Sequence, residues 1–336
     1  MDRIAIVGVG LIGGSLGLAL KKSGVGDLEV AGYDADREAL RRAKTAGAVD
    51  VAAASLADAA RGAGVVVVAT PISAVRDVLA ALGSAVREGA VITDVASTKQ
   101  QVMAWAREAL PDTVSFVGGH PMAGKETAGI ENADADLFRD RAYCIAPSPL
   151  ASESAVQSVV NLATAVGANP IFVDPGEHDQ YVAAVSHLPM VVAYALFSTA
   201  RASGSWHDIA PLAGPGFRDT TRLASGDPLL ARDITSTNRD AIVTWLDRMA
   251  AELISYRDLV ADGSLEELEE AFSQVEESRA RFLAGVDRPP EPERGEVVAV
   301  SPFRSMFLGG WVSDRWDRLE RELRQREEDV RRRRRR

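Results

Sequence analysis

Cysteine, aromatic side chains and long apolar runs are all scarce in this sequence. One cysteine among 336 residues excludes an intramolecular disulfide, and the sequence has no Cys-x-x-Cys pair or His/Cys cluster that would predict a structural metal site. The longest apolar stretch, residues 188–200, is shorter than the roughly 18–20 residues that a membrane span needs. The N-terminus has no basic region followed by a long apolar core. We therefore expect a cytoplasmic protein with no bound metal and no membrane partner.

Positive charge is also in deficit. The chain has 38 Lys and Arg against 48 Asp and Glu, a net charge of −10, although its last six residues are all arginine. An acidic body argues against a nucleic-acid partner, and a terminal arginine run is typical of a solvated chain end. The remaining composition, 46% hydrophobic and 26% charged, is that of a globular protein, and the length favours about two domains.

Strand and helix signals alternate over the first half of the chain. Short apolar runs predict strands at residues 3–7, 28–33, 65–69, 91–94, 114–117, 142–146 and 170–173. Amphipathic stretches between them predict helices at residues 11–23, 36–46, 73–86, 98–110 and 152–166. This alternation indicates an α/β fold, a Rossmann-type doubly wound parallel sheet with helices on both faces.

The second half reads as all-helical. Helices are predicted at residues 175–202, 228–262 and 265–284, with start signals at Asp174-Pro175, Asp227-Pro228 and Ser264. Their apolar faces exceed what one thin bundle can bury, which favours a homodimer. From residue 287 the chain is rich in proline and charge. The predicted domains are a dinucleotide-binding domain at 1–173, a helical substrate-binding and dimerisation domain at 174–286, and a tail at 287–336.

A glycine motif follows the first predicted strand and opens the first predicted helix. It reads Gly8-Val9-Gly10-Leu11-Ile12-Gly13. The first glycine permits a tight turn, the second lets the backbone approach a pyrophosphate, and the third allows close helix packing, while free N–H groups at the helix start bind the anion. Gly8, Gly10, Leu11, Ile12 and Gly13 are therefore candidate cofactor-binding residues.

Asp34 ends the second predicted strand. An acid at this distance from the glycine motif can bind the ribose hydroxyls of the cofactor, and it repels a 2′-phosphate, which favours NAD over NADP. Alternatively, Asp34 caps the helix that follows. The nearby Arg37, Arg41 and Arg42 count somewhat against the preference for NAD.

Three further segments are expected at the same edge of the sheet. Thr70-Pro71 and Ser97 follow two predicted strands, and His120 stands on a loop after a third, between two glycines and a proline. Because carboxyl ends of parallel strands line the ligand crevice, these residues are placed to face the nicotinamide half of a cofactor. An imidazole there can accept a proton near neutral pH. Alternatively, Ser97 only caps the next helix and Thr70 only begins a turn.

Five motifs occur in this order along the chain: GVGLIGGSLG, DVASTK, GGHPMAG, VSHLPM and, at residues 214–228, GPGFRDTTRLASGDP. Together they resemble the prephenate/arogenate dehydrogenase family of tyrosine biosynthesis, over residues 3 to about 285. The resemblance implies an NAD-dependent enzyme that oxidatively decarboxylates prephenate to 4-hydroxyphenylpyruvate and CO2. Arogenate dehydrogenase, which gives tyrosine directly, stays open as an alternative. A non-catalytic NAD-binding regulator is a more remote one.

The resemblance also implies roles for individual residues. His120 accepts the proton of the substrate hydroxyl, Ser97 orients that hydroxyl, and Arg222 binds a substrate carboxylate. Asp219, three residues before Arg222, is expected to pair with it and aim it.

The resemblance implies roles for two further residues, His187 and Glu126. His187 is expected to bind substrate or nicotinamide, in a helix that Pro189 kinks, and Glu126 is expected at the substrate mouth. The other histidines, His178 and His207, are expected on the surface. Some relatives carry a regulatory domain at the C-terminus, and the short tail here does not resemble one.

Overall fold

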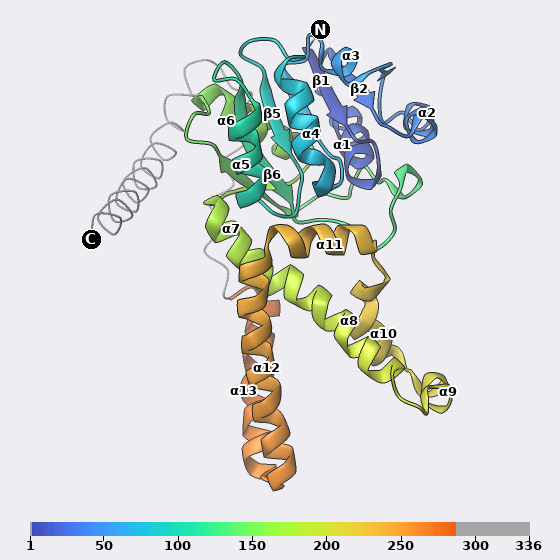
Figure 1. Ribbon diagram of the computed structural model, residues 1–336, viewed down its shortest axis with the longest axis vertical. Helices are drawn as coiled ribbons and strands as arrows, with labels where there is room; N and C mark the ends of the chain where they lie inside the picture. Colours follow the sequence, from blue (N-terminus) through green and yellow to red (C-terminus); the bar gives the residue numbers. More distant parts are fainter. Residues whose placement is uncertain (1, 287–336) are drawn as a thin grey trace, which may run out of the picture. The chain divides into compact units, whose positions relative to one another are not determined.

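The computed structural model describes residues 2–286 (Figure 1). The chain divides after Leu246 into two compact units. The first holds a large sheet, its flanking helices and most of the helical region. The described part of the second consists of the end of one long helix and the helix after it. The predicted tail, residues 287–336, lies outside the described residues.

The first unit contains an eight-stranded sheet, in the order β3-β2-β1-β4-β5-β6-β7-β8 (Figure 1). The strands are β1 (Asp2–Val7), β2 (Leu28–Tyr33), β3 (Val51–Ala52), β4 (Val65–Val68), β5 (Val91–Asp94), β6 (Ser115–Pro121), β7 (Ala142–Pro147) and β8 (Asn169–Phe172). All neighbours pair in parallel except β6 and β7, which are antiparallel. The α/β class is confirmed, while the expectation of an all-parallel sheet is wrong at this one pair.

The same pair corrects the expected position of His120, which lies on strand β6 and not on a loop. β6 continues through Gly118 and Gly119, and His120 stands opposite Cys144 of β7. Glycine and proline in this motif are typical of a turn, but here glycine permits close packing. A Cβ on Gly119 would lie 2.5 Å from the carbonyl oxygen of Asp94. His120 is therefore part of the sheet, and only 7% of its surface is exposed.

Helices that flank the sheet begin where cap residues supply hydrogen bonds. Asp36, Ser55 and Ser152 each accept a hydrogen bond from a backbone N–H in the first turn of a helix. The helices are α1 (Leu11–Lys22), α2 (Arg37–Thr45), α3 (Leu56–Ala60), α4 (Ile72–Gly83), α5 (Gln100–Ala109) and α6 (Glu153–Ala165). β3 and α3 were not predicted, because elements this short show no periodicity.

The helical region begins with one long helix interrupted by a wide turn. α7 (Pro175–Val182) leads through a π-helical turn, Ala183–His187, into α8 (Leu188–Arg201). The irregularity that Pro189 predicted lies in this turn. Because proline lacks an N–H and its ring crowds the carbonyl four residues earlier, the wider turn relieves the helix at that point. Four short helical segments follow: α9 (Trp206–Ile209), a 3-10 turn at Ala210–Leu212, α10 (Pro215–Thr221) and a second 3-10 turn at Arg222–Ser225.

Asn238 divides the long helix predicted at residues 228–262. It separates α11 (Pro228–Thr237) from α12 (Arg239–Asp262), and its backbone has φ −128° and ψ 37°. α13 (Leu265–Leu283) follows. Asp174 and Asp227 cap α7 and α11 as expected, whereas the side chain of Ser264 makes no capping bond to α13.

One hydrophobic core joins the sheet to the first helices of the helical region. Ile92 of β5 and Leu79 of α4 belong to it, and so do Ala183 from the π turn and Ile234 from α11. Burial of apolar surface therefore holds the π turn, α11 and the start of α12 against the sheet within the first unit.

Candidate active site

The glycine loop between β1 and α1 has the backbone that the motif requires. Gly8 has φ +93°, which favours glycine, and a Cβ there would lie 2.5 Å from the carbonyl oxygen of Ala69. A Cβ on Gly13 would collide with the Gly8 carbonyl, whereas one on Gly10 would meet no described atom within 4 Å. Gly10 caps α1 without a side chain, and the first turn holds no acidic residue. The loop thus offers free N–H groups and a positive helix end to an anion.

The carboxylate of Asp34 lies against this glycine loop. Its Oδ2 accepts a hydrogen bond from the N–H of Val9 at 2.9 Å, and its Oδ1 accepts one from the N–H of Asp36 at 2.9 Å. The residue that caps α2 is Asp36, so the capping alternative for Asp34 is wrong. Its binding of ribose remains a prediction.

The three arginines after Asp34 have partners of their own. Arg37 donates to the carbonyl oxygen of Ala54 at 2.7 Å. Arg41 and Arg42 both pair with Glu38, at 2.6 and 3.6 Å. Because these guanidinium groups are already engaged, they weaken the preference for NAD less than their number suggests.

Thr70 and Pro71 connect β4 to α4. Pro71 is the cap position of α4 and supplies no side-chain hydrogen bond. The hydroxyl oxygen of Thr70 is buried without a partner among the described residues. An unsatisfied buried hydroxyl costs about 1–3 kcal/mol, which a bound polar group would offset.

A buried ion pair shapes the loop that carries Ser97. Lys99 Nζ pairs with Asp94 Oδ2, and both side chains are fully buried. Asp94 also accepts hydrogen bonds from the N–H of Ala96 at 2.9 Å and from the N–H of Gly119 at 3.1 Å. Ser97 lies between the two charged residues and is not the cap of α5, which is Lys99. The pair therefore holds the Ser97 loop against β6 at Gly119, the residue directly before His120.

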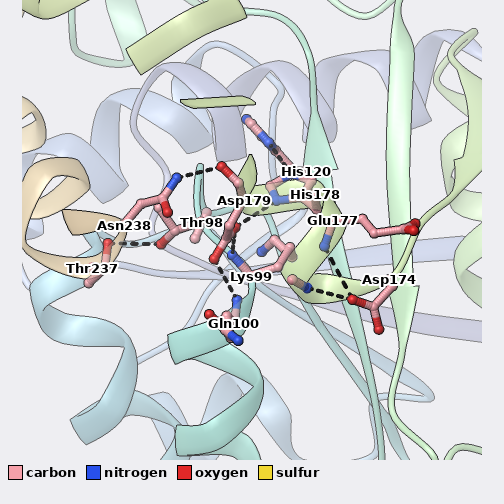
Figure 2. Close-up of polar contacts among 12 residues, drawn as sticks. Thr98, Lys99, Gln100, His120, Asp174, Glu177, His178, Asp179, Thr237 and Asn238 are labelled. Carbon is pink, nitrogen blue, oxygen red and sulfur yellow. Dashed lines mark hydrogen bonds and ion pairs between the residues drawn. The ribbon is translucent and has the colours of Figure 1, made fainter. Parts of the chain in front are cut away.

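His178 corrects a prediction, because it is buried rather than on the surface. It comes from α7, is 1% exposed, and its Nε2 lies 2.9 Å from Nδ1 of His120 (Figure 2). On its other side, His178 Nδ1 lies 2.8 Å from Oδ1 of Asp179. Burial, followed by the charges of His178, Lys99 and His187, lowers the pKa of His120 well below its ordinary value. His120 is therefore neutral near pH 7. His207 is exposed, as expected.

Asp179 connects α7 to the start of α5. Its carboxylate accepts hydrogen bonds from the N–H of Lys99 at 2.7 Å and from the N–H of Gln100 at 2.9 Å (Figure 2). Its backbone carbonyl accepts a hydrogen bond from Nδ2 of Asn238 at 2.7 Å. Beside it, the hydroxyl groups of Thr98 and Thr237 are 2.9 Å apart.

His187 is fully buried in the π turn. Its Nδ1 lies 3.2 Å from Nδ2 of Asn238, and its Nε2 is buried without a hydrogen-bond partner among the described residues. Because Asn238 Nδ2 can only donate, Nδ1 of His187 is the acceptor and Nε2 carries the hydrogen. Burial lowers the pKa of His187 to about 4, with Asp179 and the Ser97 backbone opposing the shift. His187 is thus a neutral imidazole whose ring lies beside the Ser97 loop.

Arg222 pairs with Glu126 and not with Asp219, which corrects the expected pairing. Glu126 lies on the segment after β6, and Arg222 begins the 3-10 turn that follows α10, Arg222–Ser225. Their side chains are 33% and 58% exposed. Asp219 is exposed on α10. The ion pair connects the sheet to the helical region at an accessible place.

The structure thus brings together residues that the sequence suggested and others that it did not. Ser97 and His120 lie at the ends of neighbouring strands, and His187 lies beside the Ser97 loop. Sequence reasoning assigned no role to Asp94, Lys99, His178, Asp179 and Asn238. Asp94 and Lys99 stood in a recognised motif, whereas nothing local marked the other three.

Comparisons with known proteins identify the family of the chain. Residues 16–172 match the family model "Prephenate dehydrogenase, nucleotide-binding domain", and residues 174–274 match "Prephenate dehydrogenase, dimerization domain". The chain is 35% identical to a prephenate dehydrogenase of Bacillus subtilis over 300 residues, 89% of this chain and 79% of the relative.

Two solved structures are similar as well. The prephenate dehydrogenase of Aquifex aeolicus with hydroxyphenyl propionate and NAD+ has a TM-score of 0.78 at 30% identity, covering 84% of this chain and 98% of that one. The Synechocystis arogenate dehydrogenase has a TM-score of 0.71 at 28% identity, covering 83% and 99%. The resemblance seen in the motifs is confirmed: this chain belongs to the prephenate dehydrogenase family.

Proposed function

We propose that this chain is an NAD-dependent prephenate dehydrogenase of tyrosine biosynthesis, which converts prephenate to 4-hydroxyphenylpyruvate and CO2. One observation carries the proposal. A buried, neutral histidine on β6 stands beside the Ser97 loop, in the sheet whose glycine loop offers a phosphate site. A proton acceptor next to a dinucleotide site is what the oxidation of an alcohol requires.

The residues of the first unit fit NAD. Gly8, Gly10 and Gly13, with the N–H groups of Leu11 and Ile12, would hold the pyrophosphate. Asp34 would bind the adenosine ribose, and Thr70 with Pro71 would line the nicotinamide side. The hydroxyl of Thr70, buried without a partner among the described residues, supports a polar ligand beside the segment that follows β4. NAD, when bound, accepts the hydride that leaves the ring carbon bearing the hydroxyl.

His120 and Ser97 handle the proton of this reaction. Nε2 of His120 accepts the hydroxyl proton as the C–H bond breaks, and Ser97 orients that hydroxyl. The bond from the ring to its carboxylate then breaks, CO2 departs, and the electron pair completes the aromatic ring. The ring oxygen takes the proton back from His120, which restores the neutral imidazole. A low pKa keeps His120 ready to accept at neutral pH.

Arg222 would hold a carboxylate of the substrate. Its guanidinium is more than half exposed, and its partner Glu126 occupies the position that an incoming carboxylate would take. Displaced from Arg222, Glu126 would stand at the substrate mouth. Asp219 is a further candidate for binding the substrate, and His187 is a candidate for binding the substrate or the nicotinamide.

A homodimer is part of the proposal, because apolar side chains stay exposed in both units. They include Leu196 and Phe197 of α8 and, in the second unit, Leu253, Ile254, Val260, Phe272 and Val275. The helix at Pro175–Arg201 is long and apolar enough to cross a membrane, with a mean hydropathy of 1.5 and 22% of that window buried. We assign these surfaces to a second copy, in line with the dimerization-domain match at residues 174–274. The predicted domain limits and the cytoplasmic location belong to this proposal as well.

The test is NADH absorbance after mixing the purified protein with NAD+ and either prephenate or arogenate. We expect turnover with prephenate and a weaker response when NADP+ replaces NAD+. Turnover with arogenate alone would make the enzyme an arogenate dehydrogenase. Binding of NAD+ without turnover of either substrate would favour the non-catalytic regulator. Light scattering during gel filtration tests the dimer, and a monomeric mass would contradict it.

A further inference from the structure

A buried row of three side chains, Asp179, His178 and His120, ends at the proposed proton acceptor (Figure 2). We propose that His178, held by Asp179, is a positioning residue that keeps the hydrogen of His120 on Nδ1 and leaves the lone pair on Nε2. The inference rests on the proposed function, in which Nε2 of His120 accepts the substrate proton.

The assignment of hydrogens starts at Asp179, because a carboxylate only accepts hydrogen bonds. Its two oxygens accept from the N–H groups of Lys99 and Gln100, at 2.7 and 2.9 Å. These groups belong to the start of α5, a ten-residue helix whose positive end favours a charged acid. The third partner, His178 Nδ1 at 2.8 Å, must therefore donate.

The second step follows from the chemistry of a neutral imidazole. When Nδ1 of His178 carries the hydrogen, its Nε2 has a lone pair and can only accept. Nδ1 of His120 lies 2.9 Å away and must then supply the hydrogen of that bond. Nε2 of His120 is left with a lone pair. This is the form that can accept a proton from a substrate hydroxyl.

The opposite tautomer of His178, with its hydrogen on Nε2, would reverse the arrangement. Nδ1 of His120 would then accept, and Nε2 of His120 would carry the hydrogen and lose its capacity to accept one. The groups around the two histidines are Asp179 on α7, Lys99 at the start of α5, His187 in the π turn and Cys144 opposite His120 on β7. Asp94 of β5 binds the backbone of Gly119, the residue before His120.

Two variants of His178 separate positioning from packing. The oxygen of the glutamine in His178→Gln can take the place of Nε2 and accept from His120. The shorter amide of His178→Asn can replace Nδ1 and contact Asp179, but it does not reach His120. We expect kcat to fall by about 10²-fold in His178→Asn, with KM for prephenate within about threefold, since a general-base contribution is typically worth ~10²–10⁴. His178→Gln should recover at least about tenfold of that loss.

The exposed His207 supplies the matched control, because His207→Asn should leave kcat unchanged. Equal losses in His178→Asn and His178→Gln, or an unchanged kcat in His178→Asn, would overturn the proposal. The pH profile of kcat adds a second measurement. In His178→Asn its acidic limb should shift, whereas a purely structural role would scale the profile without moving it.

Long-range proton–nitrogen NMR spectra test the hydrogen positions without turnover. The chain has four histidines, so substitutions can assign each ring. We expect a protonated Nδ1 and an unprotonated Nε2 at His120 in the unaltered protein, and a mixture of the two forms in His178→Asn. A proton on Nε2 of His120 in the unaltered protein would refute the inference. Absence of prephenate turnover with the expected spectrum would refute only the proposed function.

Discussion

The buried ion pair between Lys99 and Asp94 gives a sharp prediction about stability. Both side chains are fully buried. In Lys99→Met the shape of the side chain is largely kept, but the carboxylate of Asp94 loses its counter-charge in the core. Breaking a buried pair in this way typically costs about 3–5 kcal/mol. Because the N–H groups of Ala96 and Gly119 still bind Asp94, we expect the lower end, about 3 kcal/mol.

Urea unfolding followed by circular dichroism measures this loss. Removing the charge as well, in Asp94→Asn/Lys99→Met, should recover at least half of it, since no unpaired charge is then buried. Lys22→Met is the matched control: Lys22 pairs with Asp136 where both side chains are about half exposed, so it should cost less than about 1 kcal/mol. A loss below about 1 kcal/mol in Lys99→Met, or a double variant as unstable as the sum of the single ones, would refute this account.

Four further outcomes are expected. His120→Asn should lower kcat by about 10²–10⁴-fold with KM for prephenate nearly unchanged, and an unaltered kcat would remove His120 from the proton step. Arg222→Ala should raise KM steeply while a normal KM would place the carboxylate elsewhere. Asp34→Ser should bring the kcat/KM values for NAD+ and NADP+ closer together, and a constant ratio would exclude the ribose role. His187 is neutral in the folded state down to about pH 4, whereas the unfolded chain binds its proton near pH 6.5. Stability from this group should therefore be complete at pH 7.5 and decrease by at most about 3 kcal/mol as the pH falls from 6.5 to 4, and urea midpoints that decrease equally in His187→Gln would contradict it.

The elements that were predicted well are those whose signals are local. Apolar runs marked β2 and β5 to the residue, and the glycine motif marked the turn into α1. The wrong predictions concern residues whose structure depends on contacts with a segment that is distant in the sequence. Gly118-Gly119 carries the local signature of a turn, and only the pairing with β7 continues β6 through His120.

The partner of Arg222 shows the same bias toward local interactions. Asp219 stands three residues earlier, at a spacing that places two side chains on one helical face. The structure instead pairs Arg222 with Glu126, which is far away in sequence and comes from the segment after β6. Charge pairs of this kind depend on how α10 packs against other segments, and the periodicity of the sequence does not predict that packing.

His178, Asp179 and Asn238 were missed for a related reason. A His-Asp pair in the first two turns of a helix resembles a solvated, acid-rich helix start, and an asparagine in a run of helix formers resembles a surface position. Their burial follows from the shared core that packs the π turn after α7, together with α11, against the sheet. Buried polar groups in that setting generally need hydrogen-bond partners, and for His178 and Asp179 these are supplied by β6 and by the start of α5.

These bonds also explain why the sheet and the first helices of the helical region have a defined relative position. Apolar contacts are not directional, so the shared core alone tolerates small shifts. Ser73 N–H donates to Asp233 at 2.9 Å, Thr98 contacts Thr237 at 2.9 Å, and Asn238 binds Asp179 at 2.7 Å. A shift of α7 by about 1 Å would break the Asn238–Asp179 bond and the His120–His178 contact together, because hydrogen bonds weaken steeply outside their normal range. The network that seats the helices is therefore the one that orients the proposed proton acceptor.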